Sequence, residues 1–201
     1  MSVAAVVLAA GLSTRFGAAN KLLAELGGRP LLRRPLDAVL GVTTAPPLVV
    51  LGHQAEAVRA RLAGLAVDLA TNPDVAEGQQ CSVAFGLARA PDADLTLVVP
   101  GDLALLTAPA LETLLAAART ALPGRITVPM RGEARGNPVV LSRQARAAVL
   151  AGGPRLGCAG FTRRHPGLVH RFESDTPAFF ADVDTAEDLA RLRDEMADAG
   201  R

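Results

Sequence analysis

A glycine-containing basic stretch near the start of the chain, AAGLSTRFGAANKLL at residues 9–23, has side chains suited to binding phosphate. Gly11 would let the backbone approach a ligand, Arg15 can hold a phosphate group through paired N–H donors, and Lys21 supplies a point charge. The stretch matches neither the GxGxxG pattern nor the P-loop pattern. It is therefore either a phosphate-binding segment or a solvated basic loop, and the residue types leave both open.

A carboxylate follows a strongly apolar run in LTLVVPGDLALL, residues 95–106. If the run is a strand, Asp102 lies at its carboxyl end, at the edge of the sheet where open α/β sheets bind ligands. A carboxylate there suits Mg²⁺, which takes one or two carboxylates together with phosphate oxygens and water. The alternative is a turn residue or a cap for the next helix.

A pair of carboxylates, Asp182 and Asp184, alternates along FFADVDTAEDL, residues 179–189. In an extended segment both side chains project from the same face. Two like charges side by side need either a nearby cation or full solvation by water. The pair favours a metal site only if it meets Asp102 in the folded chain.

Polar residues surround a predicted helix start in TNPDVAEGQQCSVAFGLA, residues 71–88. Asn72 belongs to a turn, Gly78 ends an acidic loop, and Ser82 lies in the first helical turn. The free N–H groups of a helix start and a serine hydroxyl can meet the polar edge of a ligand, but Ser82 could equally serve as a cap. Cys81 has no histidine close in sequence that would activate it as a nucleophile.

The composition excludes several classes of function. Lys and Arg number 21 against 20 for Asp and Glu, so the net charge of +1 gives no overall attraction to nucleic acid or to an anionic membrane. Trp and Tyr are absent, which leaves few rings for stacking bases. The two cysteines and three histidines show no metal-ligand spacing and suggest no Ser/His/Asp triad. We expect a soluble, cytoplasmic protein with no nucleic-acid or membrane partner.

Apolar runs alternate with amphipathic stretches, which predicts an α/β domain with a mostly parallel sheet covered on both faces. The expected strands are residues 3–8, 48–51, 66–70, 95–99 and 126–128. The expected helices between them are residues 30–40, 54–62, 82–88 and 109–118.

After residue 128 the pattern is less regular. We expect a loop at 131–137, a strand at 138–141, a helix at 142–150 capped by Ser142, and a break at 152–154. Strands at 168–172 and near 179–183 and a last helix opening at Thr185 follow, where TAED is a capping-box arrangement. Residues 1–201 are expected to form a single domain.

Together the four stretches resemble the MobA-like nucleotidyltransferases. The N-terminal signature of that family reads roughly AAG-x-S-x-R-x-G, a few residues, KLL and G-x-PLL, and residues 9–32 read AAGLSTRFGAANKLLAELGGRPLL. Downstream, NPDVAEGQQCSVAFGL, PGD and DVDTAEDL follow in the family's order. The resemblance spans nearly the whole chain, and four signatures in one order make it specific.

Within the family the chain is most similar to the molybdenum cofactor cytidylyltransferases. The guanylyltransferase branch typically has LAGG and a DK pair where this chain has LAAG at 8–11 and NK at 20–21. The stretch MRGEARGNPVVLS resembles the G-x-x-GHPVLF segment at the pterin end of the site. Two departures concern the acceptor: Asn137 stands in place of the usual His, and GGPRLGCAGFTRRHP replaces GD-x-GAR-x-LL.

The resemblance implies a three-layer, Rossmann-like nucleotide-diphospho-sugar transferase (GT-A-like) fold and transfer of CMP from CTP to molybdopterin with release of pyrophosphate. It implies Mg²⁺ held by Asp102 and by Asp182, with Asp184 as the alternative second ligand, and catalysis by Arg15, Lys21 and Asp102. The implied acceptor contacts are Asn137 and Pro138. The implied nucleotide contacts are Leu8, Ala9, Ala10, Gly11, Ser13, Arg15, Lys21, Asn72, Gly78, Ser82 and Gly101.

Two other functions are compatible with these residues. One keeps the fold and uses GTP, or a sugar phosphate or alditol phosphate as acceptor. The other is a non-catalytic carrier of the molybdenum cofactor, which would have no need of Arg15, Lys21 and Asp102 together. A molybdoenzyme or its chaperone would be the protein partner, and the chain itself would be a monomer or a weak oligomer.

Overall fold

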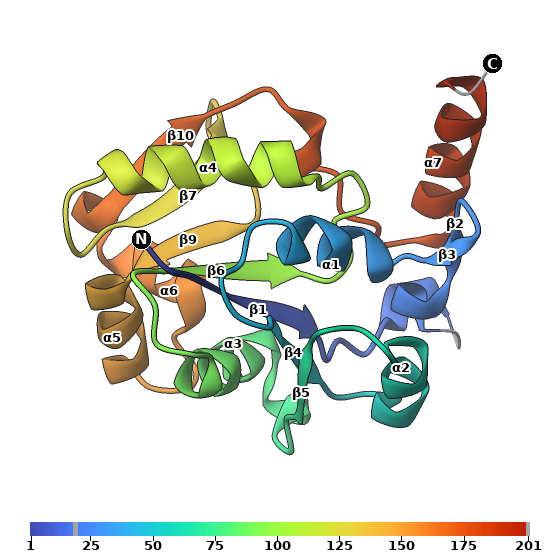
Figure 1. Ribbon diagram of the computed structural model, residues 1–201, viewed down its shortest axis with the longest axis horizontal. Coiled ribbons are helices and arrows are strands. Elements are labelled where there is room, and N and C mark those ends of the chain that lie inside the picture. Colours follow the sequence, from blue (N-terminus) through green and yellow to red (C-terminus); the bar gives the residue numbers. More distant parts are fainter. Residues whose placement is uncertain (18–19, 200–201) are drawn as a thin grey trace.

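The computed structural model describes residues 1–17 and 20–199, in which one central sheet carries helices on both faces (Figure 1). The strand order across the sheet is β10-β7-β9-β6-β1-β4-β5, with β8 paired to β7. In the described part of the chain, β8 and β9 run against their neighbours and the other pairs are parallel, so the predicted mostly parallel sheet is confirmed. The strands are β1 (Val3–Ala9), β4 (Leu48–Leu51), β5 (Asp68–Thr71), β6 (Leu95–Pro100), β7 (Ile126–Arg131), β8 (Ala134–Arg135), β9 (Val139–Ser142) and β10 (Val169–Glu173).

Strand β1 lies in the interior of the sheet, between β6 and β4, and every one of its seven residues is buried. Val6 pairs with Leu48 of β4 on one side and with Val98 of β6 on the other. A strand covered on both faces needs apolar residues at odd and even positions, which explains the unbroken run VAAVVLA. The carboxyl ends of β1 and β6 consequently emerge side by side at one edge of the sheet.

Two layers of helices complete the predicted three-layer α/β arrangement, which is confirmed. On one face α1 (Arg33–Leu40), α2 (Ala55–Arg61) and α4 (Ala108–Thr120) bury Leu36, Val58 and Leu111 in one apolar cluster. On the other face α3 (Gln79–Arg89), α5 (Arg143–Ala151) and α6 (Gly157–Arg164) form a second cluster. Within the described ranges, none of these helices is long and apolar enough to cross a membrane.

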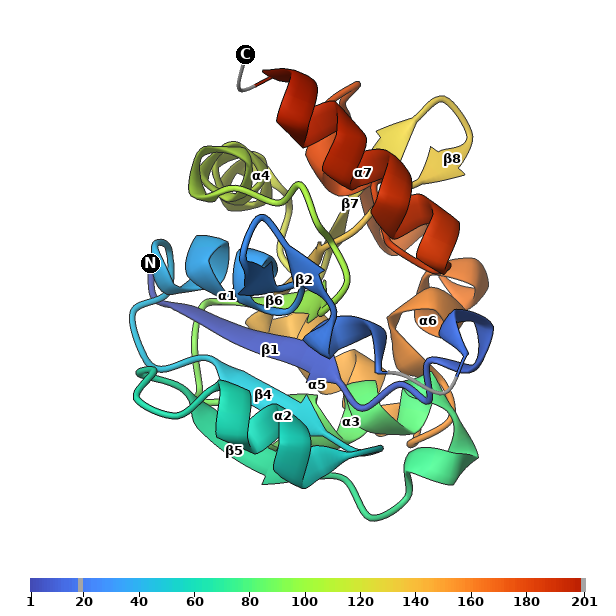
Figure 2. The ribbon, with the colours of Figure 1, turned by 90° about the vertical axis from the view of Figure 1, so that its right-hand side faces the viewer.

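The last helix, α7 (Ala186–Ala199), lies beside the small hairpin of β2 (Glu25–Leu26) and β3 (Arg29–Pro30), as both views show (Figures 1 and 2). Leu26, Leu189 and Leu192 belong to a third apolar cluster that joins them. The capping box is confirmed: the Thr185 N–H donates to Asp188 Oδ2 at 3.0 Å, and the Asp188 N–H donates to Thr185 Oγ1 at 3.1 Å.

The strand expected near 179–183 does not form. Residues Pro177–Phe179 make a short 3₁₀ turn, and Asp182 forms an isolated bridge with Leu103. The Val183 N–H donates to the Asp102 carbonyl at 3.1 Å, and the Ala104 N–H donates to the Ala181 carbonyl at 3.2 Å. The segment is held by the turn that follows β6 and not by the edge of a strand, so it is extended without joining the sheet.

Two other expectations need correction, and one helix was not expected. The helix expected at 30–40 begins at Arg33, because Arg29–Pro30 pairs with Glu25–Leu26 in the hairpin. The expected loop at 131–137 contains a second hairpin, in which Met130 pairs with Arg135. Helix α6 was not predicted: Gly157 and Gly160 weaken the helical pattern there, although Phe161 packs in the core.

Candidate functional site

A cavity of about 440 Å³ opens at the carboxyl ends of β1 and β6. Its size lies in the range typical of small-molecule sites, and its position is the one that open α/β sheets use for ligands. The predicted nucleotide-binding residues that line it are Leu8, Ala10, Gly11, Ser13, Arg15, Lys21, Gly78, Ser82 and Gly101. The predicted metal ligands Asp102, Asp182 and Asp184 and the acceptor residue Asn137 line it as well.

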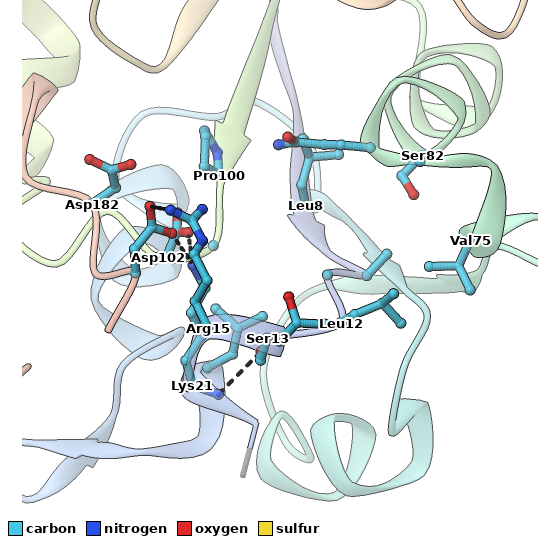
Figure 3. A pocket seen from close by; sticks show the side chains of 18 of the residues that line it. Leu8, Leu12, Ser13, Arg15, Lys21, Val75, Ser82, Pro100, Asp102 and Asp182 are labelled. Atoms are coloured by element: carbon cyan, nitrogen blue, oxygen red, sulfur yellow. Dashed lines mark hydrogen bonds and ion pairs between the residues drawn. The ribbon is translucent and has the colours of Figure 1, made fainter. Parts of the chain in front are cut away.

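Lys21 lies at the centre of a charged cluster on one side of this cavity (Figure 3). Its Nζ is 2.6 Å from Asp102 Oδ2 and 3.0 Å from Asp184 Oδ1. Arg15 Nη1 is 2.8 Å from Asp184 Oδ2. The fold thus brings together the basic stretch, the Gly-Asp turn and the late aspartates. The Lys21 side chain is only 14% exposed, which argues against a solvated loop at that residue, whereas Arg15 at 70% is largely in solvent.

Local hydrogen bonds place Lys21 in this position. It begins the 3₁₀ turn η2 (Lys21–Leu23), which Asn20 caps by accepting the Leu22 N–H at 3.0 Å. The Lys21 N–H donates to Ser13 Oγ at 3.3 Å, and Ser13 itself has a left-handed backbone with φ of 53°. The basic stretch is therefore folded back on itself, with both ends of the loop at the cavity.

The charged cluster changes the protonation equilibria of two of its members. Burial alone would lower the pKa of Lys21, but the Asp102 and Asp184 carboxylates hold it above its ordinary value, so the ammonium stays charged. Burial raises the pKa of Asp182, and the nearby negative charges of Asp102 and Asp184 raise it further. A cation near Asp182 would relieve that repulsion.

One carboxylate oxygen of Asp102 has no hydrogen-bond partner in the described structure, as is expected of a metal ligand. Its Oδ2 accepts from Lys21, while its Oδ1 is buried and has no hydrogen-bond partner in the described structure. A buried acceptor without a donor is costly unless a ligand satisfies it. Among residues 1–17 and 20–199, no group of three or more His, Cys, Asp or Glu side chains is placed to hold a metal ion. The unpartnered Asp102 oxygen and the nearby Asp182 carboxylate fit a cation that takes one or two carboxylates and completes its shell with phosphate oxygens and water.

The turn after β6 lines the cavity and does not cap the next helix. Helix α4 is capped by Thr107, whose Oγ1 accepts the Ala110 N–H at 3.4 Å, so Asp102 is not a helix cap. The Gly101 N–H donates to the Leu8 carbonyl at 3.0 Å, and a Cβ on Gly101 would lie only 2.7 Å from that oxygen. Gly101 thus allows the turn to cross the end of β1 at close range.

The opposite side of the cavity is mainly apolar (Figure 3). Leu8, Leu12 and Val75 line it together with Ser82, which projects from α3. Ser82 does not cap this helix, because α3 begins at Gln79 and its N-cap residue, Gly78, has no side chain. The Ser82 oxygen instead accepts from Asn72 Nδ2 at 3.0 Å.

Three predicted contact residues do not line the cavity. Ala9 packs in the core cluster on the face of α1 and α4, Asn72 lies behind Ser82, and Pro138 is buried. The structure adds lining residues that were not predicted from sequence: Leu12, Thr14, Leu22, Val75, Ala76, Gln79 and Pro100. Most of these lie between singled-out neighbours, so continuity along the stretches 9–23 and 71–88 is the signal that would have found them.

The two cysteines are poor candidates for a nucleophile. Both are free and buried. Burial raises the pKa of the Cys158 thiol to about 12, which keeps it protonated at neutral pH. The charged side chains that line the cavity are a lysine, an arginine and three aspartates.

Comparison with known sequences gives a match to the MobA-like NTP transferase domain over residues 5–168. A curated relative, the bifunctional protein GlmU of Pelobacter propionicus, is 38% identical over 140 residues. That alignment covers 64% of this chain and 30% of the relative, so the chain spans less than a third of the length of that protein.

Three solved structures share the fold. A nucleotidyl transferase from a Methanothermobacter species has a TM-score of 0.82 at 23% identity, with 98% of this chain and 99% of that chain covered. Rv0371c of Mycobacterium tuberculosis in complex with manganese has a TM-score of 0.73 at 26% identity, covering 96% and 99%. A CMP:2-keto-3-deoxy-manno-octonic acid synthetase in complex with CTP has a TM-score of 0.76 at 15% identity, covering 99% and 100%.

Proposed function

The chain belongs to the family of MobA-like NTP transferase domains, and we propose on that premise that it transfers a nucleoside monophosphate from a nucleoside triphosphate to a phosphorylated small molecule. CTP is the favoured donor and molybdopterin the favoured acceptor. The sequence features that support this choice are LAAG at 8–11 and NKLL at 20–23, together with GNPVVL at 136–141. A fold neighbour with CTP bound is consistent with the choice of nucleotide.

The observation that carries the proposal is the division of the cavity into two chemically different sides. Lys21, Arg15 and Asp102 gather on one side, and Leu8, Leu12 and Val75 gather on the other. A nucleoside triphosphate has the same division, with a flat base of low charge at one end and a polyanion at the other. The proposed orientation places the base near Ser82 and the triphosphate near Arg15 and Lys21.

Asp102 and Asp182 are the proposed ligands of a divalent cation, with Mg²⁺ favoured. The buried, unpartnered Asp102 Oδ1 and the crowding of negative charge at Asp182 support this assignment. A manganese complex of a structural neighbour is consistent with a divalent metal in the fold. When bound, such a cation would neutralise charge on the phosphate oxygens and help to align them.

The chain's own residues then have defined tasks in an in-line displacement. Lys21 and Arg15 would hold the triphosphate, exchanging some of their contacts with Asp184 for contacts with phosphate oxygens. A phosphate oxygen of the acceptor forms a bond to the α-phosphorus, and the bond from the α-phosphorus to the bridging oxygen breaks, so pyrophosphate leaves. The attacking oxygen is already anionic, and positioning and charge neutralisation are therefore sufficient without a general base.

Pyrophosphate release tests the proposal directly. We expect release that requires the divalent cation, CTP and molybdopterin together, and a fall in kcat/KM of at least about 100-fold in Asp102→Asn. The matched control is Asp68→Asn, which removes an exposed carboxylate on β5 outside the cavity and should keep the wild-type rate. Circular dichroism and the melting temperature of both variants would verify that each is folded.

The same assay separates the alternative functions. Turnover with GTP, or with a sugar phosphate or alditol phosphate as the acceptor, would replace the favoured substrates and keep the mechanism. Tight binding of nucleotide or cofactor without pyrophosphate release from any acceptor would contradict the enzyme proposal and support a carrier. A molybdoenzyme or its chaperone would then be the partner to test by direct binding.

A further inference from the structure

Asn72 forms a buried hydrogen-bond relay behind the apolar side of the cavity. Asn72 and Ser82 are each only 2% exposed, and Asn72 Nδ2 lies 3.0 Å from Ser82 Oγ. The other end of the same amide is also used, because Asn72 Oδ1 accepts the backbone N–H of Asp74 at 3.0 Å. A backbone N–H can only donate, so the amide oxygen must face Asp74 and the amide nitrogen must face Ser82.

The direction of the Asn72 bond determines the role left to the Ser82 hydroxyl. Since the amide nitrogen donates to the Ser82 oxygen, the single proton of that hydroxyl must point elsewhere. Within residues 1–17 and 20–199, the bond from Asn72 is the one hydrogen bond found at the Ser82 oxygen, and no oxygen accepts the hydroxyl proton. Ser82 lines the cavity and Asn72 does not, and the hydroxyl projects from α3 toward the apolar side (Figure 3).

We infer that Asn72 is a positioning residue that holds Ser82 as a hydrogen-bond donor toward an acceptor atom on the base of the bound nucleotide. The inference rests on the proposed function, and it changes the expected role of Asn72 from a ligand contact to a residue that acts through Ser82. Leu8, Leu12 and Val75 lie on the same side of the cavity as Ser82 and offer a base apolar faces, and Gln79 is the other polar side chain that α3 contributes to the lining. A single directed donor there favours bases that present an acceptor atom to it. A base that presents a donor instead would bring two N–H or O–H groups together with no acceptor for either.

The near-isosteric variant Asn72→Asp reverses the relay. A carboxylate retains the acceptor for the Asp74 N–H but has no N–H to donate, so the Ser82 hydroxyl would turn and donate to it. The hydroxyl proton is then lost to the ligand while the size of the side chain is unchanged. We expect the dissociation constant for CTP to rise by roughly 3–10-fold in Asn72→Asp, with a similar rise in Ser82→Ala.

The double variant and a ligand without a base make the test specific. If Asn72 acts only through Ser82, then Asn72→Asp combined with Ser82→Ala should bind CTP no more weakly than Ser82→Ala alone. Tripolyphosphate, which has no base and fits only the charged side of the cavity, should bind wild type and both single variants with equal affinity. A general structural defect would weaken both ligands together.

Isothermal titration calorimetry with CTP and with tripolyphosphate provides these numbers without relying on turnover. Wild-type affinity for CTP in Asn72→Asp, or additive losses in the double variant, would overturn the inference. If Asn72→Asp fails to fold, equal affinity of Ser82→Ala and wild type for CTP would overturn it as well. Failure of the wild type to bind any nucleotide would contradict the proposed function itself, which is a different outcome.

Discussion

The Lys21 ammonium lies between two carboxylates that come from distant parts of the chain, Asp102 after β6 and Asp184 before α7. A lysine with two anionic partners is well stabilised when no ligand is present, because it neutralises a cluster that would otherwise repel itself. A triphosphate offers the same lysine a stronger set of anionic oxygens. We propose that Lys21 holds the charged cluster together before binding and contacts the triphosphate afterwards.

The two late aspartates differ in their partners, and that difference assigns them different roles. Both carboxylate oxygens of Asp184 are occupied, Oδ1 by Lys21 at 3.0 Å and Oδ2 by Arg15 at 2.8 Å. Among residues 1–17 and 20–199 no salt bridge to Asp182 forms, and burial and the negative charges of Asp102 and Asp184 raise its pKa despite the positive charge of Lys21. We propose that Asp182 is the second metal ligand and that Asp184 orients the two basic side chains.

A metal titration of the two variants tests this assignment. In Asp182→Asn we expect the divalent cation concentration for half-maximal activity to rise about 10-fold or more, the equivalent of one lost carboxylate contact worth about 1.4 kcal/mol. In Asp184→Asn the metal requirement should stay near the wild-type value, while the KM for the triphosphate changes because Lys21 and Arg15 lose a competing partner. The reverse pattern would make Asp184 the ligand.

The ligand-free stability of Asp182→Asn gives an independent check. A raised native pKa means that folded protein binds the Asp182 proton more tightly than unfolded protein does, so ionisation above the ordinary pKa costs stability at neutral pH. Removing the charge should therefore leave the melting temperature unchanged or raise it. A marked fall would indicate that the Asp182 carboxylate makes a stabilising contact that outweighs the charge repulsion.

At the scale of elements, the site depends on how closely the turn after β6 approaches the end of β1. A Cβ at Gly101 would lie 2.7 Å from the Leu8 carbonyl oxygen and 2.9 Å from Leu32 Cδ1. Neither neighbour is the free end of a flexible side chain, since one is backbone and the other is part of the core. Gly11, at the end of β1, has no such constraint, because a Cβ there would meet nothing within 4 Å.

These two glycines form a matched pair for mutation. Gly101→Ala should lower the free energy of unfolding by about 1–3 kcal/mol through overpacking, and should lower activity because Asp102 moves with the turn. Gly11→Ala should change stability by less than about 0.5 kcal/mol but weaken CTP binding, since the added methyl group occupies space at the cavity. Chemical denaturation and calorimetry measure the two effects separately. Unchanged CTP affinity in Gly11→Ala would contradict the proposed position of the base.

At the scale of the whole molecule, the charge is almost balanced, so the proposed anion binding has to come from a local arrangement. The net charge of +1 conceals the grouping of Arg15, Lys21 and three aspartates at one edge of the sheet. A cavity that reaches between β1, β6, α3 and the segment before α7 exists only in the folded state. Ligand binding should accordingly stabilise the whole fold by mass action.

A thermal-shift series measures this linkage. CTP with the divalent cation at about 100 times its dissociation constant should stabilise the protein by about 2.7 kcal/mol, which corresponds to a rise in melting temperature of roughly 5–10 °C for a chain of this size. At the same concentrations of ligand and cation, GTP should give a smaller shift than CTP, and Asp102→Asn should reduce the shift with CTP. Equal shifts for CTP and tripolyphosphate at the same concentration would show that the apolar side of the cavity adds no binding energy.

Much of the fold follows from local pattern, and the exceptions have identifiable causes. The run VAAVVLA of β1 is apolar at every position and the run LTLVVP of β6 is apolar except at Thr96, because both faces of these strands are covered; both are therefore recognisable as buried strands from sequence. Helix α6 is hidden by Gly157 and Gly160, which have low helix propensity and are accepted because Phe161 and Cys158 pack in the core. The apparent strand near 179–183 reads as one by composition, but its hydrogen-bond partners are in a turn.

The candidate site likewise has features that could be predicted from sequence and contacts that only the folded structure reveals. The sequence by itself determined that Asp102 follows a buried strand and that a glycine-containing basic stretch follows another, because parallel strands deliver their carboxyl ends to one edge of a sheet. Only the tertiary structure decided that Lys21 pairs with Asp184, which lies 163 positions away, and that Asn72 faces Ser82 and not the cavity. Residue types and local periodicity encode elements, whereas side-chain contacts depend on distances between elements that are set by packing in the complete core.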